Sequence, residues 1–113
     1  MSEVTVVDLE NQKDQFKKLV ELRDIADKLC RNRDFKKLIL EEYMVNEAAR
    51  LVQVSGDPNL TKDQKEDALA MAQATGHLKR YLQVVTQMGN HAESQIPNID
   101  DEIAELRSMG DDE

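Results

Sequence analysis

Two histidines and one cysteine are the residues of this 113-residue chain best suited to bind a transition metal. His77 and His91 stand fourteen positions apart, and on one helix this spacing separates them by roughly 21 Å. Zinc needs three or four ligands around one ion, and Cys30 has no second cysteine to pair with. The sequence therefore predicts no metal site and no cofactor, and Cys30 is interpreted as a small buried residue.

Oxygen-bearing side chains alternate in the middle of the chain, as they do at the start of a calcium-binding loop. They belong to Asp57, Asn59, Thr61 and Asp63. Such a loop needs a glycine where Lys62 stands and a bidentate glutamate where Ala68 stands. We therefore interpret these residues as a turn followed by a helix cap.

Acidic clusters are the remaining candidates for catalysis, at Glu41-Glu42 and at Asp100-Asp101-Glu102. Paired carboxylates act as acid and base when burial separates their pKa values, whereas these fall on predicted exposed faces or at a predicted helix start. The sequence holds no glycine-rich phosphate loop and no nucleophile elbow. We predict that the protein is not an enzyme.

Charge is distributed unevenly along the chain, which carries a net charge of −8. Residues 13–37 hold nine basic and five acidic residues, while residues 93–113 hold one basic and eight acidic residues. Arg31, Arg33, Lys36 and Lys37 surround a polar break. They could contact phosphates or dock on an acidic protein surface, and opposite ends could attract each other between copies. Nucleic acid is the less favoured partner because the whole chain is acidic and the next helix is largely apolar.

The spacing of apolar residues predicts the helices on which the residues discussed above lie. Apolar positions three and four apart predict helices over about 9–30, 34–54, 61–93 and 99–108. Asn32 or Asp34 is expected to cap the second helix, and Thr61 with Gln64 forms a capping-box pattern for the third. Gly56 is expected to end the second helix in a left-handed conformation, and the segment Ile96-Pro97-Asn98 is expected to break the third from the fourth.

The predicted fold class is all-α, a helical hairpin or three-helix bundle with a short C-terminal helix and an acidic tail. Residues 1–8 are expected to be a flexible N-terminus, residues 9–108 a single helical domain, and residues 109–113 a disordered tail. The third helix has the most regular apolar stripe, which comprises Met71, Ala74, Leu78, Tyr81, Val85, Met88 and Ala92. Gly76 and Gly89 lie along this helix and are expected to weaken it or to permit a close helix approach.

The second helix is apolar over a wide arc. One stripe comprises Phe35, Leu38, Val45, Ala49 and Val52, and beside it lie Ile39, Met44, Ala48 and Leu51. An arc of this width predicts contact on two sides, and surplus apolar surface predicts self-association.

Three segments of the chain resemble small helical proteins encoded by tailed bacteriophages. They are LCRNRDFKKLI at 29–39, EAARLV at 47–52 and GDP at 56–58, and the resemblance covers about residues 22–106. It implies an uncharacterised phage product that acts in head or connector assembly, and it supplies no functional residues.

Together these observations predict a non-catalytic phage structural or assembly protein, resembling a scaffold, decoration or neck component. We expect it to form a homo-oligomer and to dock on a larger protein, such as a phage head or connector component. The residues predicted to bind partners are Arg31, Arg33, Lys36, Lys37, Phe35, Ile39, Tyr43, Tyr81 and Met88. Two alternatives stay open: a small acidic inhibitor of a host nucleic-acid enzyme, and a DNA-binding helical protein.

The expected location is the host cytoplasm, with incorporation in the virion as a further expectation. The first residues lack the basic and apolar regions of a signal peptide, and a lone cysteine does not suit a disulfide-stapled secreted domain. No stretch approaches the ~20 apolar residues of a membrane span, so no membrane partner is predicted.

Overall fold

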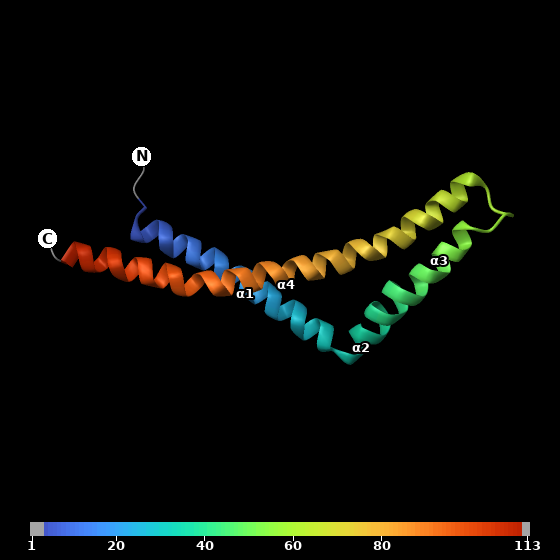
Figure 1. The fold of residues 1–113 in the computed structure, drawn as a ribbon. Helices are drawn as coiled ribbons and strands as arrows, with labels where there is room; N and C mark the ends of the chain where they lie inside the picture. The colour runs from blue at the N-terminus through green and yellow to red at the C-terminus, as the bar shows by residue number, and fades with distance from the viewer. Residues whose placement is uncertain (1–3, 112–113) are drawn as a thin grey trace. The chain divides into compact units, whose positions relative to one another are not determined.

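The computed structural model describes residues 4–111, and every regular element among them is helical. The elements are α1 (Val6–Arg31), α2 (Arg33–Phe35), the π-helical segment η1 (Lys36–Glu47), α3 (Ala48–Ser55) and α4 (Lys62–Asp111) (Figure 1). The predicted all-α class is confirmed. Because α2, η1 and α3 follow one another without a break, they form the single rod that was predicted over about 34–54.

The chain divides into two compact units, which we describe separately. The terminal unit contains residues 1–26 and 85–113, and the hairpin unit contains residues 27–84.

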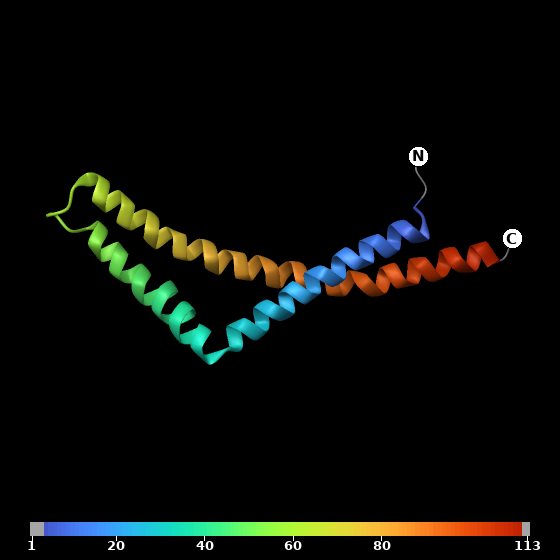
Figure 2. The ribbon, with the colours of Figure 1, turned by 180° about the vertical axis from the view of Figure 1, so that it is seen from behind.

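In the terminal unit, the first part of α1 packs antiparallel against the last part of α4, seen as the blue and the orange-to-red helices of Figures 1 and 2. Leu9, Ile99 and Ile103 form the buried core, and Val6, Phe16 and Leu106 pack against it. Ion pairs between Lys13 and Asp100 and between Glu10 and Arg107 flank this core.

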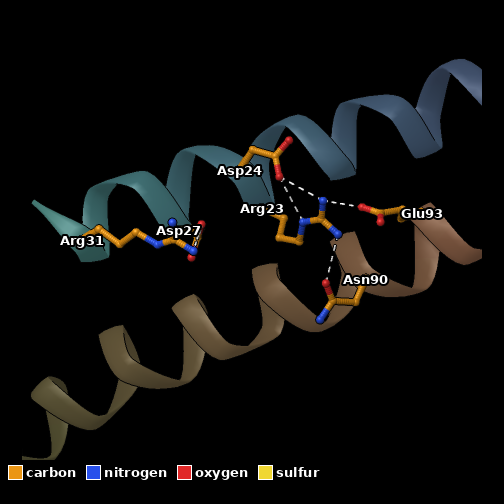
Figure 3. Close-up of polar contacts among 6 residues, drawn as sticks. All are labelled: Arg23, Asp24, Asp27, Arg31, Asn90 and Glu93. Carbon is orange, nitrogen blue, oxygen red and sulfur yellow. Dashed lines mark hydrogen bonds and ion pairs between the residues drawn. The ribbon is translucent and has the colours of Figure 1, made fainter.

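The two helices of the terminal unit approach closely at Gly89. A Cβ atom built there would overlap the Cβ of Arg23 and would lie 2.9 Å from its Cγ and Cδ. The Arg23 guanidinium then donates to the Asn90 side-chain oxygen (3.0 Å) and to Asp24, and pairs with Glu93 (Figure 3). Glu93, and after it Asp24, raise the pKa of Arg23 by accepting its hydrogen bonds. Gly89 therefore permits the close approach considered from the sequence.

In the hairpin unit, α3 packs against the first part of α4 across the turn at 56–61. Leu51, Ala68 and Ala72 are buried together, with Val54 packed on them. Thr75 is also buried, and its hydroxyl donates to the Ala72 carbonyl oxygen (2.8 Å), which satisfies this polar group. One leucine and small side chains thus form the core of this unit.

Two predicted helix starts are confirmed. The Asn32 side chain caps α2 by accepting from the Phe35 N–H (3.0 Å). Thr61 and Gln64 form a reciprocal capping box, since each side chain accepts from the other's backbone N–H, at 3.2 and 3.0 Å. The turn before it is closed by Asp57, which accepts from the Asn59 N–H (2.9 Å), as its interpretation as a turn residue predicted.

The predicted left-handed conformation of Gly56 is wrong. Gly56 has φ −95° and ψ 0°, in the bridge region. The Gly56 N–H donates to the Gln53 carbonyl and the Asp57 N–H to the Val54 carbonyl. These tight turns satisfy the last carbonyls of α3, so a left-handed residue is not needed.

The predicted break at Ile96-Pro97-Asn98, with a separate helix over 99–108, is also wrong. Helix α4 runs continuously from Lys62 to Asp111 with Pro97 inside it. Pro97 is exposed, so its ring meets no packed neighbour. Beyond it, Ile99 and Ile103 lie in the terminal core, and this packing offsets the ~3 kcal/mol that an internal proline costs a helix.

The helices also extend into the segments expected to lack regular structure. Residues 6–8 belong to α1 and residues 109–111 to α4. The remaining parts of the expected N-terminus and acidic tail include residues 1–3 and 112–113, which lie outside the described residues.

Candidate interaction surface

A hollow of about 490 Å³ opens in the hairpin unit where α1, α2 and η1 follow one another. It is lined by Arg31, Arg33, Lys36, Lys37 and Glu41, and we call it the basic hollow. The structure thus brings together the four cations predicted to bind a partner. The Asn32 cap aids this convergence because it turns the chain between Arg31 and Arg33.

Carboxylates of the same chain neutralise part of the basic hollow. Arg31 pairs with Asp27 one helical turn away (3.1 Å; Figure 3). Lys37 pairs with Glu42 (2.9 Å) and Glu41 (3.7 Å). The Glu42 contact is the larger cause that raises the pKa of Lys37, and in return Lys37, with Asn46 second, lowers the pKa of Glu42.

The other two cations have no such partner. Among residues 4–111, neither Arg33 nor Lys36 forms an ion pair, and both side chains are exposed. The positive charge available to an external anion in the basic hollow is therefore concentrated on Arg33 and Lys36.

A second, shallower hollow of about 390 Å³ lies along η1. It is lined by Leu38, Glu42, Tyr43, Asn46, Glu47 and Arg50. Arg50 pairs with Glu47, which lowers the pKa of Glu47. This hollow combines apolar carbons with engaged charges, a mixture that suits a protein surface better than a small anion.

An uncovered apolar stripe runs along the rod of α2, η1 and α3. Leu38, Val45 and Val52 are 66%, 60% and 53% exposed, and we call these three residues the outer stripe. They are spaced seven residues apart. Leu38 and Val45 lie in the π-helical segment η1, and Val52 lies in α3. The inner side of the same rod carries Ile39, Met44 and Ala48, which are half-buried, and Leu51, which is buried. Only one side of the wide apolar arc is therefore covered within the hairpin unit.

The regular stripe predicted on the third helix is also left largely open in the hairpin unit. There α4 buries Ala68, Ala72 and Thr75, while Met71 and Tyr81 stay more than half exposed. The stripe that packs is displaced by one helical position from the predicted one. The outer stripe, Met71 and Tyr81 thus leave the hairpin unit with apolar surface on both of its helices.

The remaining residues predicted to bind partners are spread over several places. Phe35 and Ile39 are half-buried, Tyr43 lines the second hollow, and Tyr81 and Met88 are exposed. Met88 belongs to the terminal unit and the others to the hairpin unit. The sequence did not predict the π-helical segment η1, which contains 12 residues.

Residues considered for chemistry lie apart. His77 is exposed, His91 meets Phe16 edge to face with ring centroids 6.3 Å apart, and Cys30 is half-buried. Residues 4–111 contain no group of three or more His, Cys, Asp or Glu side chains arranged to hold a metal ion. In this described range, no helix has both the length and the apolar character of a membrane span.

Comparison with known proteins gives no relative: no protein-family model, no curated protein and no solved structure matches the chain.

Proposed function

We propose that this chain is a non-catalytic assembly protein that associates with its own copies and docks on a larger protein through helix faces. The observation that carries the proposal is the outer stripe. Its three aliphatic side chains are each more than half exposed, on a rod whose Ile39, Met44 and Ala48 are half-buried and whose Leu51 is buried.

Exposed apolar surface of this kind marks an interaction site when it is contiguous. Scattered single apolar residues are ordinary on protein surfaces, whereas Leu38, Val45 and Val52 repeat along one rod and are accompanied on α4 by Met71 and Tyr81. A helix from a second copy would cover the outer stripe by packing its side chains against these residues.

Association would also complete the bundle predicted from the sequence. The core of the hairpin unit consists of Leu51 with Ala68 and Ala72, so two helices bury little apolar surface between them. A third helix contributed by a neighbouring copy would cover the outer stripe and enlarge that core. The resemblance to small helical phage proteins suggests that the larger partner is a head or connector component.

The alternative of an acidic inhibitor has less support. That hypothesis requires the carboxylates of residues 93–113 to be displayed, and two of them are engaged inside the terminal unit, Glu93 by Arg23 and Asp100 by Lys13. Those two carboxylates stabilise the helix pair instead of imitating a phosphate backbone.

Light scattering over a concentration series tests the proposal with a matched pair of substitutions. Val52→Lys and Gln53→Lys add the same side chain at neighbouring exposed positions, and only the first lies on the outer stripe. We expect the wild type and Gln53→Lys to grow in mass with concentration, and Val52→Lys to associate more weakly while remaining helical. A wild-type mass that equals the monomer at every concentration would refute self-association.

A further inference from the structure

The basic hollow and the C-terminal end of α4 carry opposite charge on residues that form no ion pair within the described part of the chain. The inference drawn from them rests on the proposed self-association and identifies one contact through which it occurs. Because the two surfaces belong to different units of the chain, each is described from its own unit.

Two of the four basic residues of the hollow already form ion pairs within the chain, and the other two can bind an external anion. Arg31 is held by Asp27, and Lys37 by Glu41 and Glu42. Arg33 and Lys36 stay exposed and form no ion pair among the described residues. The hollow has room for several carboxylate groups at about 490 Å³, and its rim includes a single acidic residue, Glu41.

The available anions lie on the exposed side of α4. Asp100 is paired with Lys13, but Asp101, Glu102 and Glu105 are exposed and form no ion pair within residues 4–111. Asp101 and Glu105 lie one helical turn apart, so they project from the same face. This face points away from the core formed by Ile99 and Ile103.

We propose that the basic hollow of one copy binds the Asp101–Glu105 face of α4 from a second copy. The contact is heterologous, because it joins two different surfaces. The pair then keeps one free acidic face, on the first copy, and one free hollow, on the second, so the contact propagates into a ring or a filament. This geometry suits a protein whose role is to build an assembly, and the apolar outer stripe adds a second, salt-insensitive contact.

Charge complementarity favours a second copy over nucleic acid as the occupant. The chain carries a net charge of −8, which repels a phosphate backbone as a whole. A second copy presents its carboxylates on a short helical segment of matching size. Exposed ion pairs contribute ~0.2–1 kcal/mol each, so several of them would change the dissociation constant by roughly tenfold.

Charge reversal on each surface tests the contact in the full-length protein. The first variant is Arg33→Glu with Lys36→Glu, and the second is Asp101→Lys with Glu105→Lys. Matched controls reverse exposed charges elsewhere, with Lys17→Glu and Lys18→Glu for the first and Asp14→Lys and Glu21→Lys for the second. Circular dichroism checks that each variant remains folded, as expected for surface changes.

Analytical ultracentrifugation is expected to show association weakened about tenfold in each reversed variant and unchanged in the controls. Raising salt from about 0.05 to about 0.5 M should weaken the wild type similarly, because the Debye length falls from roughly 14 to roughly 4 Å. A mixture of the two reversed variants should associate again, since each supplies the surface that the other lacks.

The other outcomes overturn the inference and separate it from the proposed function. If the wild type associates and the reversed variants associate equally well, self-association stands and this contact is wrong. If the wild type never associates, both ideas fail. If the first variant only loses binding to a short DNA duplex, the basic hollow is a phosphate site and no second copy occupies it.

Discussion

At the scale of single residues, a glycine of α4 in the terminal unit lies close to the Cβ atom of an arginine of α1. Gly89 lies against Arg23, whose Cβ atom is fixed to the backbone of α1. A flexible side-chain tip could move aside, but a Cβ atom moves only with its helix. This single position therefore controls how closely α1 and α4 approach, and with it the ion pair of Arg23 with Glu93.

We expect Gly89→Ala to lower the free energy of unfolding, by up to ~2 kcal/mol. Overpacking costs ~1–3 kcal/mol, which exceeds the ~1 kcal/mol that alanine gains over glycine in a helix. Gly76→Ala is the matched control on the same helix, because a Cβ there meets nothing within 4 Å, and it should stabilise by ~0.5–1 kcal/mol. Urea unfolding followed by circular dichroism measures both, and equal effects at the two positions would contradict the close approach.

A second prediction at this scale concerns acid. The hydrogen bonds from Lys37 and Asn46 lower the pKa of Glu42, so the folded state holds this carboxylate ionised more strongly than the unfolded state. The stability gained is present above the ordinary glutamate pKa of ~4.3 and is lost as the pH falls through the lowered folded-state value.

Glu42→Gln should therefore be less stable than the wild type near neutral pH and should lose less stability between about pH 5 and about pH 3. Melting temperatures across this range measure the difference. Glu21→Gln is the control, because Glu21 is exposed and forms no ion pair within the described residues. An acid dependence of Glu42→Gln that parallels the wild type would show that the Lys37 contact does not form.

At the scale of elements, helix α4 is a single helix with a proline inside it. Pro97 is exposed and lies between the crossing at Gly89 and the core residues Ile99 and Ile103. The proline removes a backbone donor and its ring crowds the preceding turn. Since the helix continues regardless, the proline is a cost that tertiary packing offsets.

Replacing it should therefore be beneficial. We expect Pro97→Ala to raise the free energy of unfolding by roughly 1–3 kcal/mol, because alanine restores the missing N–H in an uninterrupted helix. Pro58→Ala is the control, since Pro58 lies in the turn at 56–61 and its loss should destabilise slightly, by ~0.4–1 kcal/mol. If α4 were two helices joined at Pro97, the first substitution would bring no gain.

The same elements show what the sequence could predict. Helix starts depend on neighbouring residues, so the Asn32 cap and the Thr61–Gln64 box could be predicted from a few letters. The four cations of the basic hollow were predictable together because they lie within seven positions of one another. Local chemistry suffices where the contacts are local.

Choices between neighbouring stripes were not predictable. A helix with small apolar residues on two adjacent rows can pack either one, and the row that is buried in the hairpin unit has Ala68 and Ala72, not Met71. Small side chains let helices approach more closely, but whether two helices do so depends on the shape of the facing helix. Likewise, no local sequence pattern distinguishes η1 from an α-helix. Nor do the residues around Pro97 show that the packing of Ile99 offsets the cost of a proline inside the helix.

At the scale of the whole molecule, apolar burial is unequal between the two units. The terminal unit buries Leu9, Ile99 and Ile103 together, whereas the hairpin unit buries one leucine with two alanines and leaves the outer stripe in solvent. Local opening is easier where fewer apolar contacts hold a segment. If the proposed self-association holds, we therefore expect the hairpin unit to gain more stability from it than the terminal unit does.

Hydrogen exchange measured by mass spectrometry at two protein concentrations tests this dependence. At low concentration, we expect amides of η1 and α3 to exchange faster than those around Ile99 and Ile103. At high concentration, association should slow exchange in η1 and α3, because a neighbouring helix then covers Leu38, Val45 and Val52. Protection around Ile103 should change little, and in Val52→Lys the concentration effect should be smaller. Slowing that is equal in both units, or confined to the terminal unit, would show that copies do not meet at the outer stripe.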